Sequence, residues 1–264
     1  MTQVAKTQKK PLSIKEYMSQ DGVTKKFNEL LGKESKGFIT SVLQVVSNNN
    51  LLAKAEPSSI YQAAAMAAVL DLPINNNLGL AYIVPFGNKA QLQIGWKGFY
   101  RLAIRSGDYK TIGASAIYEG QLISNNPLEG CKFDFSKPAK GKPIGYAAYF
   151  ELKNGFNKTL FMTVAELEAH GKRYSKSYNS AHSLWKKDFP SMALKTVYKM
   201  VINKFGPMSL EMQKAVLSDQ AEVENHEKDQ FSYPDSNSKE NQAEDINQQF
   251  DSAVVVEDED EDII

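Results

Sequence analysis

The stretch LAYIVPFGNKAQLQIGWKGFYRLAIRSG, residues 80–107, contains the pattern that decides the fold. It starts with an apolar run and continues with Gly87-Asn88, a dipeptide typical of a two-residue hairpin turn. Residues 89–94 then alternate polar and apolar, as a half-buried strand does. Over 96–106 the apolar residues return every three or four positions, which predicts a helix. An antiparallel hairpin is therefore followed directly by an amphipathic helix.

Outside this stretch, the patterns predict more helices and more antiparallel strands. Residues before the hairpin read mainly as helices, and a long helix is predicted at 189–205. Strands are expected near 109–118, 144–152 and 158–162, together with the hairpin at 80–95. Because helices and strands do not alternate as βαβ units, the fold class is α+β, with a small antiparallel sheet packed against helices.

Charge divides the chain into two parts, although 31 Lys and Arg balance 31 Asp and Glu over its 264 residues. Residues 1–214 contain 29 Lys and Arg and 15 acids, a net charge of +14, and 215–264 contain 2 Lys and 16 acids, a net charge of −14. The second part has few apolar residues, so we expect a disordered acidic tail at 215–264. We expect a flexible basic N-terminus at 1–24 and a folded core at 25–214. A basic core suggests a polyanionic partner, and solubilising charge is the alternative.

The sequence has no pattern typical of catalysis. It lacks a phosphate-binding GxxxxGK[ST] loop, a GxSxG elbow and an HExxH zinc motif, and its single cysteine, Cys131, allows no disulfide framework. We therefore expect a protein that is not an enzyme and needs no metal or cofactor. No long apolar run is present, and residues 1–17 lack the apolar segment of a secretory signal. We expect a soluble intracellular protein with no membrane association.

Three cations form a stripe on the helix predicted after the hairpin. Lys97, Arg101 and Arg105 are spaced at i, i+4 and i+8, so they share one face. Like charges at this spacing destabilise an isolated helix, and the stripe favours an anionic partner; a solvated face is the alternative. Two of the chain's three arginines lie in this stripe, and a guanidinium binds phosphate through two parallel hydrogen bonds.

A second group of cations is interleaved with aromatic residues. Arg173 precedes a tyrosine, and Lys186 and Lys187 follow Trp185. This composition suits single-stranded nucleic acid, whose phosphates attract cations and whose bases stack on rings. Packing in the core is the alternative for the rings. Lysines on one flank of the long helix and the polar face of the hairpin complete the predicted nucleic-acid contacts: Lys97, Arg101, Arg105, Arg173, Lys186, Lys187, Lys195, Lys199, Lys89, Gln91 and Gln93.

Several collinear stretches resemble the RecT family of phage single-strand DNA annealing proteins. They are LDLPINNNLG at 70–79, IVP at 83–85, QIGWKGFYRLAIRSG at 93–107, and WKKDFPSMALKTV at 185–197 with GPMS at 206–209. The resemblance implies a compact α+β core with a basic groove, which binds single-stranded DNA and anneals complementary strands without ATP as rings or helical filaments. Lys199 stands where an arginine is expected in relatives, so the charge is kept without the bidentate geometry.

The resemblance also implies a location in the cytoplasm of a bacterial host cell, and it implies partners. They are single-stranded DNA and the annealed duplex intermediate, further copies of the chain, a 5′–3′ exonuclease, and the single-stranded DNA-binding protein of the host. Two other functions stay open, a phage structural or assembly oligomer without annealing activity, and a nuclease with an unrecognised site. The acidic tail has three possible roles: it keeps the protein soluble, competes with DNA for the basic core, or binds a host protein through its apolar tip, Ile263-Ile264.

Overall fold

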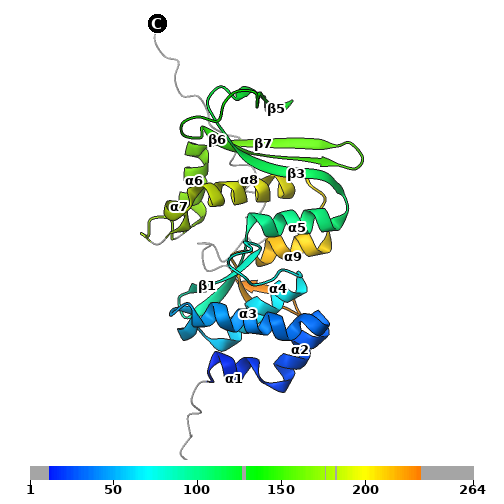
Figure 1. Cartoon of the computed structure of the whole chain (residues 1–264), viewed down its shortest axis with the longest axis vertical. Helices are drawn as coiled ribbons and strands as arrows, with labels where there is room; N and C mark the ends of the chain where they lie inside the picture. The colour runs from blue at the N-terminus through cyan, green and yellow to red at the C-terminus, as the bar shows by residue number, and fades with distance from the viewer. Residues whose placement is uncertain (1–11, 127–128, 176, 182, 233–264) are drawn as a thin grey trace, which may run out of the picture. The chain divides into compact units, whose positions relative to one another are not determined.

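The structure is a computed structural model in which helices and small antiparallel sheets form an α+β fold, as predicted (Figure 1). The residues that it describes are 12–126, 129–175, 177–181 and 183–232. They divide into two compact units. Unit 1 contains the described residues up to Gly98 and from Lys214 onward, and unit 2 contains those of Phe99–Gln213. Each unit is described separately below.

Helices make up the first part of unit 1. They are α1 (Ile14–Met18), α2 (Asp21–Leu31), α3 (Ser35–Ser47) and α4 (Pro57–Val69), with short 3-10 turns at Gly32–Glu34 and Leu52–Lys54. Pro57 occupies the first turn of α4, where its missing N–H costs no hydrogen bond. The alanines of α4 are buried, and their small side chains allow the helix to pack against α1, α2 and the hairpin strands.

The expected flexible N-terminus at 1–24 is wrong for its second half. Helix α1 begins with a capping box, in which the Ser13 hydroxyl accepts from the Glu16 N–H and the Glu16 carboxylate accepts from the Ser13 N–H. Met18, at the end of α1, is 1% exposed, and α2 already begins at Asp21. Burial of this apolar side chain holds a short helix that its length alone would not stabilise. Residues 1–11 lie outside the described residues.

The predicted hairpin consists of β1 (Ala81–Phe86) and β2 (Lys89–Ile94), joined at Gly87-Asn88. It forms a sheet of its own, so the expectation that it shares one sheet with the later strands is wrong. The reason is that a later segment bonds to β2. The N–H of Gln220 donates to the carbonyl oxygen of Leu92 at 2.9 Å, and the N–H of Ile94 donates to the Asp219 carboxylate at 2.9 Å.

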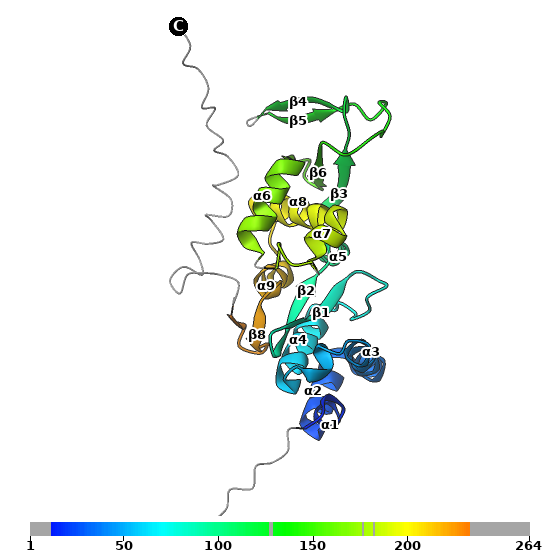
Figure 2. The same cartoon turned by 90° about the vertical axis from the view of Figure 1, so that its left-hand side faces the viewer.

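The expected tail boundary at 215 is also wrong, because residues 215–232 fold into unit 1. After α9 (Leu210–Ser218), the strands β8 (Glu222–Asn225) and β9 (Gln230–Ser232) form a second hairpin, and β8 contacts both α4 and β2 (Figure 2). Three ion pairs tie this segment to the rest of the unit or close it on itself: Lys89–Glu222 at 2.8 Å, Lys26–Glu227 at 2.6 Å and Lys214–Asp229 at 3.1 Å. Residues 233–264 of the expected tail lie outside the described residues.

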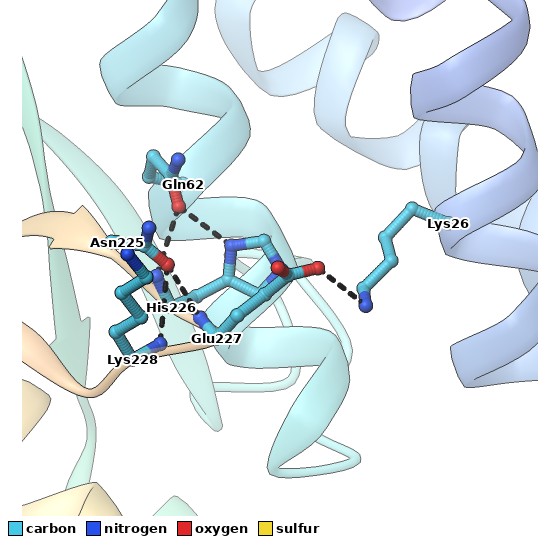
Figure 3. A network of polar contacts seen from close by, with 6 residues as sticks. All are labelled: Lys26, Gln62, Asn225, His226, Glu227 and Lys228. Carbon is cyan, nitrogen blue, oxygen red and sulfur yellow. Dashed lines mark hydrogen bonds and ion pairs between the residues drawn. The ribbon is translucent and has the colours of Figure 1, made fainter.

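His226 is the buried centre of this attachment (Figure 3). The side-chain oxygen of Gln62 on α4 accepts from the backbone N–H of His226 at 3.0 Å and lies 2.6 Å from its Nδ1. The imidazole also makes an edge contact with the ring of Tyr61, at 5.5 Å between centroids. Burial lowers the pKa of His226, so the ring is neutral near pH 7.

Unit 2 is built on the three-stranded antiparallel sheet β3-β6-β7. Its strands are β3 (Tyr109–Ile117), β6 (Gly145–Leu152) and β7 (Asn157–Thr163), close to the predicted positions. The long helix α8 (Phe189–Phe205) has the predicted bounds and contacts all three strands (Figure 1). The apolar side of α8 and the inner face of the sheet therefore form the core of this unit.

Further elements flank this core. Helix α6 (Val164–Tyr174) begins with a capping box formed by Thr163 and Glu166. The short helix α7 (Leu184–Lys187) precedes α8, and the hairpin of β4 (Leu122–Asn126) and β5 (Gly130–Phe133), which the sequence patterns did not indicate, contacts β7. Helix α5 (Trp96–Ser106) leads the chain from unit 1 into unit 2, and α9 leads it back.

Candidate nucleic-acid interface

Helix α5 presents the predicted stripe to solvent. Its buried side consists of Phe99, Leu102 and Ala103, each no more than 1% exposed. Lys97 and Arg105 are exposed and Arg101 is half-buried, on successive turns of the same helix. The stripe therefore exists as one surface of α5.

Two apolar residues of α5 are more exposed than the helical pattern indicates. We expect Tyr100 and Ile104 in the buried arc, and the structure leaves them 42% and 41% exposed. They follow Lys97 by three and seven positions, so on the helix surface they lie among the cations. The exposed side of α5 thus combines positive charge with an aromatic ring, which is typical of surfaces that bind single strands.

A carboxylate partly compensates the charge of the stripe. One Glu211 oxygen, at the start of α9, accepts from Nη2 of Arg105 at 2.7 Å and from Nε at 3.1 Å. At the other end, Nζ of Lys97 lies 5.8 Å from the centroid of the Trp96 ring. The pairing of Arg105 with Glu211 reduces the repulsion among three like charges on a single helix.

The second predicted cluster is assembled at the end of α6 and in the loop after it. The guanidinium of Arg173 lies 5.2 Å from the ring of Tyr174, and Nζ of Lys172 lies 5.9 Å from the ring of Tyr178. A Cβ at Gly171 would come within 2.8 Å of the side chains of Tyr178 and Trp185, so this position needs a glycine. Close packing therefore places exposed cations directly against rings.

The lysines of α7 extend this cluster. Lys186 and Lys187 are both exposed, and Nζ of Lys186 donates to the carbonyl oxygen of Asn179 at 2.6 Å. That bond holds the loop against the short helix. The structure thus brings Arg173 and Lys186, which are separated in sequence, onto neighbouring parts of unit 2.

One of the two lysines expected on the open flank of α8 is covered. Lys195 is 8% exposed and belongs to the buried side of the helix, so its contact with DNA stays a prediction. A wheel of the helix assigns Lys195 to the flank, but neighbouring elements cover that flank as well. Lys199 is half-buried. Burial lowers the pKa of His170 to about 4, and the charges of Lys199 and Arg173 contribute to this shift. His170 is therefore neutral near pH 7.

The expected open polar face of the β1–β2 hairpin is wrong too. Gln91 is 1% exposed, Gln93 is half-buried, and Lys89 is held by Glu222 of β8. The physical reason is that the C-terminal hairpin, expected to be part of a tail, lies beside β2. The ion pair also raises the pKa of Lys89, which keeps this lysine charged.

One cation–aromatic group has no counterpart in the sequence-based predictions. Phe205, at the end of α8, has Nζ of Lys158 at 5.6 Å and Nζ of Lys204 at 5.5 Å from its ring centroid. Lys204 adjoins Phe205 in sequence, but Lys158 comes from β7. Only the packing of α8 on the sheet reveals this group, which adds to the cations of unit 2.

Positive charge is concentrated in one unit. The described residues of unit 2 contain 16 Lys and Arg and 9 acids, a net charge of +7. Those of unit 1 contain 10 Lys and 11 acids, a net charge of −1. Apart from Lys97 and the hairpin residues, the predicted contacts all belong to unit 2. An exposed set of cations and rings within a basic unit is typical of a nucleic-acid-binding protein.

Among the described residues, no group of three or more His, Cys, Asp or Glu is arranged to hold a metal ion. No helix in this part of the chain is long and apolar enough to cross a membrane.

Comparison with known proteins shows the family. The model of the RecT family matches residues 36–231. Protein RecT of Escherichia coli (strain K12) is 30% identical over 189 residues, which cover 65% of this chain and 66% of that protein. The uncharacterized protein YqaK of Bacillus subtilis (strain 168) is 47% identical over 213 residues, which cover 80% of this chain and 74% of that protein.

The chain therefore belongs to the RecT family, a family of annealing proteins that bind single-stranded DNA in DNA recombination. The predicted family is confirmed. The matched region also extends past 214, in agreement with the folding of the C-terminal hairpin into unit 1.

Proposed function

We propose that this protein anneals complementary single strands without ATP, acting as an oligomer along the DNA. The observation that carries the proposal is the exposed face of α5, where Lys97, Arg101 and Arg105 lie in a chain that belongs to an annealing family. Cations on successive turns can neutralise successive phosphates, which reduces the repulsion between two strands.

The mechanism follows from which part of the strand is held. Contacts to phosphates position a strand and carry no sequence information, so the base edges stay available for pairing. Watson–Crick pairing then selects the partner strand, and several protein copies keep the first strand extended. The cluster around Arg173 and Lys186 provides a second set of phosphate and ring contacts within unit 2.

The family also suggests partners and a place of action. A 5′–3′ exonuclease would supply the single strand, and the single-stranded DNA-binding protein of the host would cover it before annealing. Both belong to the cytoplasm of a bacterial cell. Either protein should co-purify with this chain. If nuclease treatment of the DNA removes the co-purification, the association is indirect and passes through DNA.

The decisive experiment measures annealing of two complementary oligonucleotides in the absence of nucleotide. The full chain should accelerate duplex formation, added ATP should change nothing, and sedimentation should show DNA-dependent oligomers. A triple Lys97→Gln, Arg101→Gln, Arg105→Gln variant should make the logarithmic salt dependence of DNA binding shallower by about 2, at about 0.7 per phosphate contact.

The matched control removes three exposed lysines from the helices of unit 1, as Lys25→Gln, Lys33→Gln and Lys36→Gln. It has the same charge change and should retain the salt dependence. If both triple variants reduce the salt dependence of DNA binding equally, the effect comes from net charge and not from a specific contact of the stripe. Oligomers without DNA affinity would instead indicate a structural protein, and magnesium-dependent loss of DNA would indicate a nuclease.

A further inference from the structure

A short loop in unit 1 lies against the beginning of α5. Residues 75–79, here called the Asn-Leu loop, lead into β1. A Cβ at Gly95 would be 2.2 Å from the carbonyl oxygen of Gly79, and a Cβ at Gly98 would be 2.3 Å from that of Leu80. Because no side chain fits at such distances, the glycines allow the backbone of the loop region to pack directly on the start of the helix.

The Asn-Leu loop is shaped by its first residue and exposes the next ones. The side-chain oxygen of Asn75 accepts from the N–H of Asn77 at 3.0 Å, and its carbonyl oxygen accepts from the N–H of Leu78 at 3.0 Å. Asn76 and Asn77 are exposed, and Leu78 is 46% exposed. The preceding Ile74 is fully buried and anchors the loop, and the apolar side chain of Leu78 is exposed to solvent.

A cation of the α5 stripe lies beside this loop. The side chain of Lys97 crosses Gly79, with its Cδ 3.4 Å from the position of a Cβ there. Gly79 itself has a φ of +70°, which favours glycine. The exposed leucine and the lysine therefore share one small area of unit 1.

We propose that the Asn-Leu loop contacts the bases of bound single-stranded DNA, with Leu78 inserted between neighbouring bases and Lys97 on the adjacent phosphate. An apolar side chain that separates two bases loses its contact with water and leaves their pairing edges open. A single strand accepts such insertion more readily than a duplex, because no base pair has to be broken. This inference rests on the proposed function and adds a contact to the bases.

The chain contains a matched control. The tetrapeptide Asn-Asn-Asn-Leu occurs at 75–78 and again at 48–51, after α3. Leu51 is 63% exposed, and the side-chain oxygen of Asn49 accepts from the N–H of Leu51 at 3.0 Å. Both leucines therefore end an exposed asparagine-rich turn, but the turn of Leu51 follows α3 and does not lead to the start of α5.

The test uses the full chain and an oligothymidylate with one internal 2-aminopurine, whose fluorescence rises when its neighbours unstack. Binding of the unaltered protein should raise the fluorescence. Leu78→Ala should remove about half of this rise or more at saturation and weaken binding about three- to tenfold. Its salt dependence should stay unchanged, because no phosphate contact is lost. Leu51→Ala should behave as the unaltered protein.

The outcomes separate this inference from the proposed function. If the unaltered protein does not bind the oligonucleotide, both fail. If it binds and anneals but Leu78→Ala and Leu51→Ala give the same fluorescence, only the insertion of Leu78 is overturned. A change in oligomeric state of Leu78→Ala without DNA, seen by sedimentation, would assign Leu78 to contact between copies and would also overturn it. Circular dichroism checks that both variants fold.

Discussion

The ion pair between Arg105 and Glu211 leads to a sharp prediction for DNA binding. Both side chains are partly exposed, at 30% and 51%, and one carboxylate oxygen accepts two bonds from the guanidinium. A phosphate that binds Arg105 has to replace this carboxylate or tolerate it nearby. We therefore expect Glu211→Gln to tighten the binding of single-stranded DNA.

The magnitude follows from the lost repulsion. Two unit charges about 6 Å apart in water repel by about 0.7 kcal/mol, which corresponds to about threefold in affinity for each protein copy at low salt. If the phosphate also displaces one more counterion, the salt slope becomes steeper by about 0.7. The unfolding free energy should change by less than about 1 kcal/mol, because the pair is on the surface.

The matched control is Glu151→Gln, also within unit 2. Glu151 pairs with Lys110 at 2.7 Å, so this substitution breaks an ion pair of the same length and changes the net charge equally. Fluorescence anisotropy of a labelled oligonucleotide, measured from about 0.05 to 0.5 M salt, compares the two variants; the gain should fade as screening shortens. Equal gains, or no gain for Glu211→Gln, would refute a specific phosphate contact of Arg105.

Three further predictions concern stability and the C-terminal segment. Deletion of 219–264 should lower the free energy of unfolding in urea by about 3–6 kcal/mol. Deletion of 233–264 should leave that free energy unchanged. If the tail competes with DNA, this shorter deletion should also tighten DNA binding at low salt. Gly95→Ala should cost about 1–3 kcal/mol in the same assay, since its Cβ overlaps a carbonyl oxygen. The pKa of His226 is lowered in the folded state, so the unfolded chain takes up the proton first as pH falls. The free energy of unfolding should therefore decrease below about pH 6.5, by up to about 1.4 kcal/mol per pH unit. This decrease should be smaller in His226→Gln.

Local patterns were sufficient for most elements of the fold. The bounds of α8 and of the hairpin at β1 and β2 agree with the predicted ones, because periodicity, turn residues and caps are properties of neighbouring residues. Helix α1 was missed for the opposite reason. Its short sequence has little intrinsic helical stability, and packing against α2, α3 and α4, with Met18 buried, holds it.

The predicted site depended in the same way on what covers each face. Lys97 and Arg105 are exposed as expected because the amphipathic pattern of α5 is strong enough to orient the helix. Lys195 and Gln91 also lie on polar flanks by sequence, but both are buried by elements that a helical wheel or a strand alternation does not contain. Whether a polar flank is exposed therefore depends on tertiary packing. The helical or strand pattern shows only which residues share that flank.

The division of charge shows most clearly what the linear sequence conceals. A boundary at 215 separates a basic part from an acidic part, and it assigns all the late acids to a tail. The structure instead pairs Glu222 with Lys89 and Glu227 with Lys26, so acids just past that boundary neutralise lysines of unit 1. The net positive charge of the described residues is then concentrated in unit 2. Since Coulomb attraction is screened within about 10 Å at 0.1 M salt, the proposed function predicts that a bound strand gains most of its charge attraction from unit 2, with Lys97 as a local contact of unit 1. Under the proposed function, the ion pairs of the β8–β9 hairpin thus neutralise lysines of unit 1 and leave unit 2 as the basic part of the described chain that attracts phosphates.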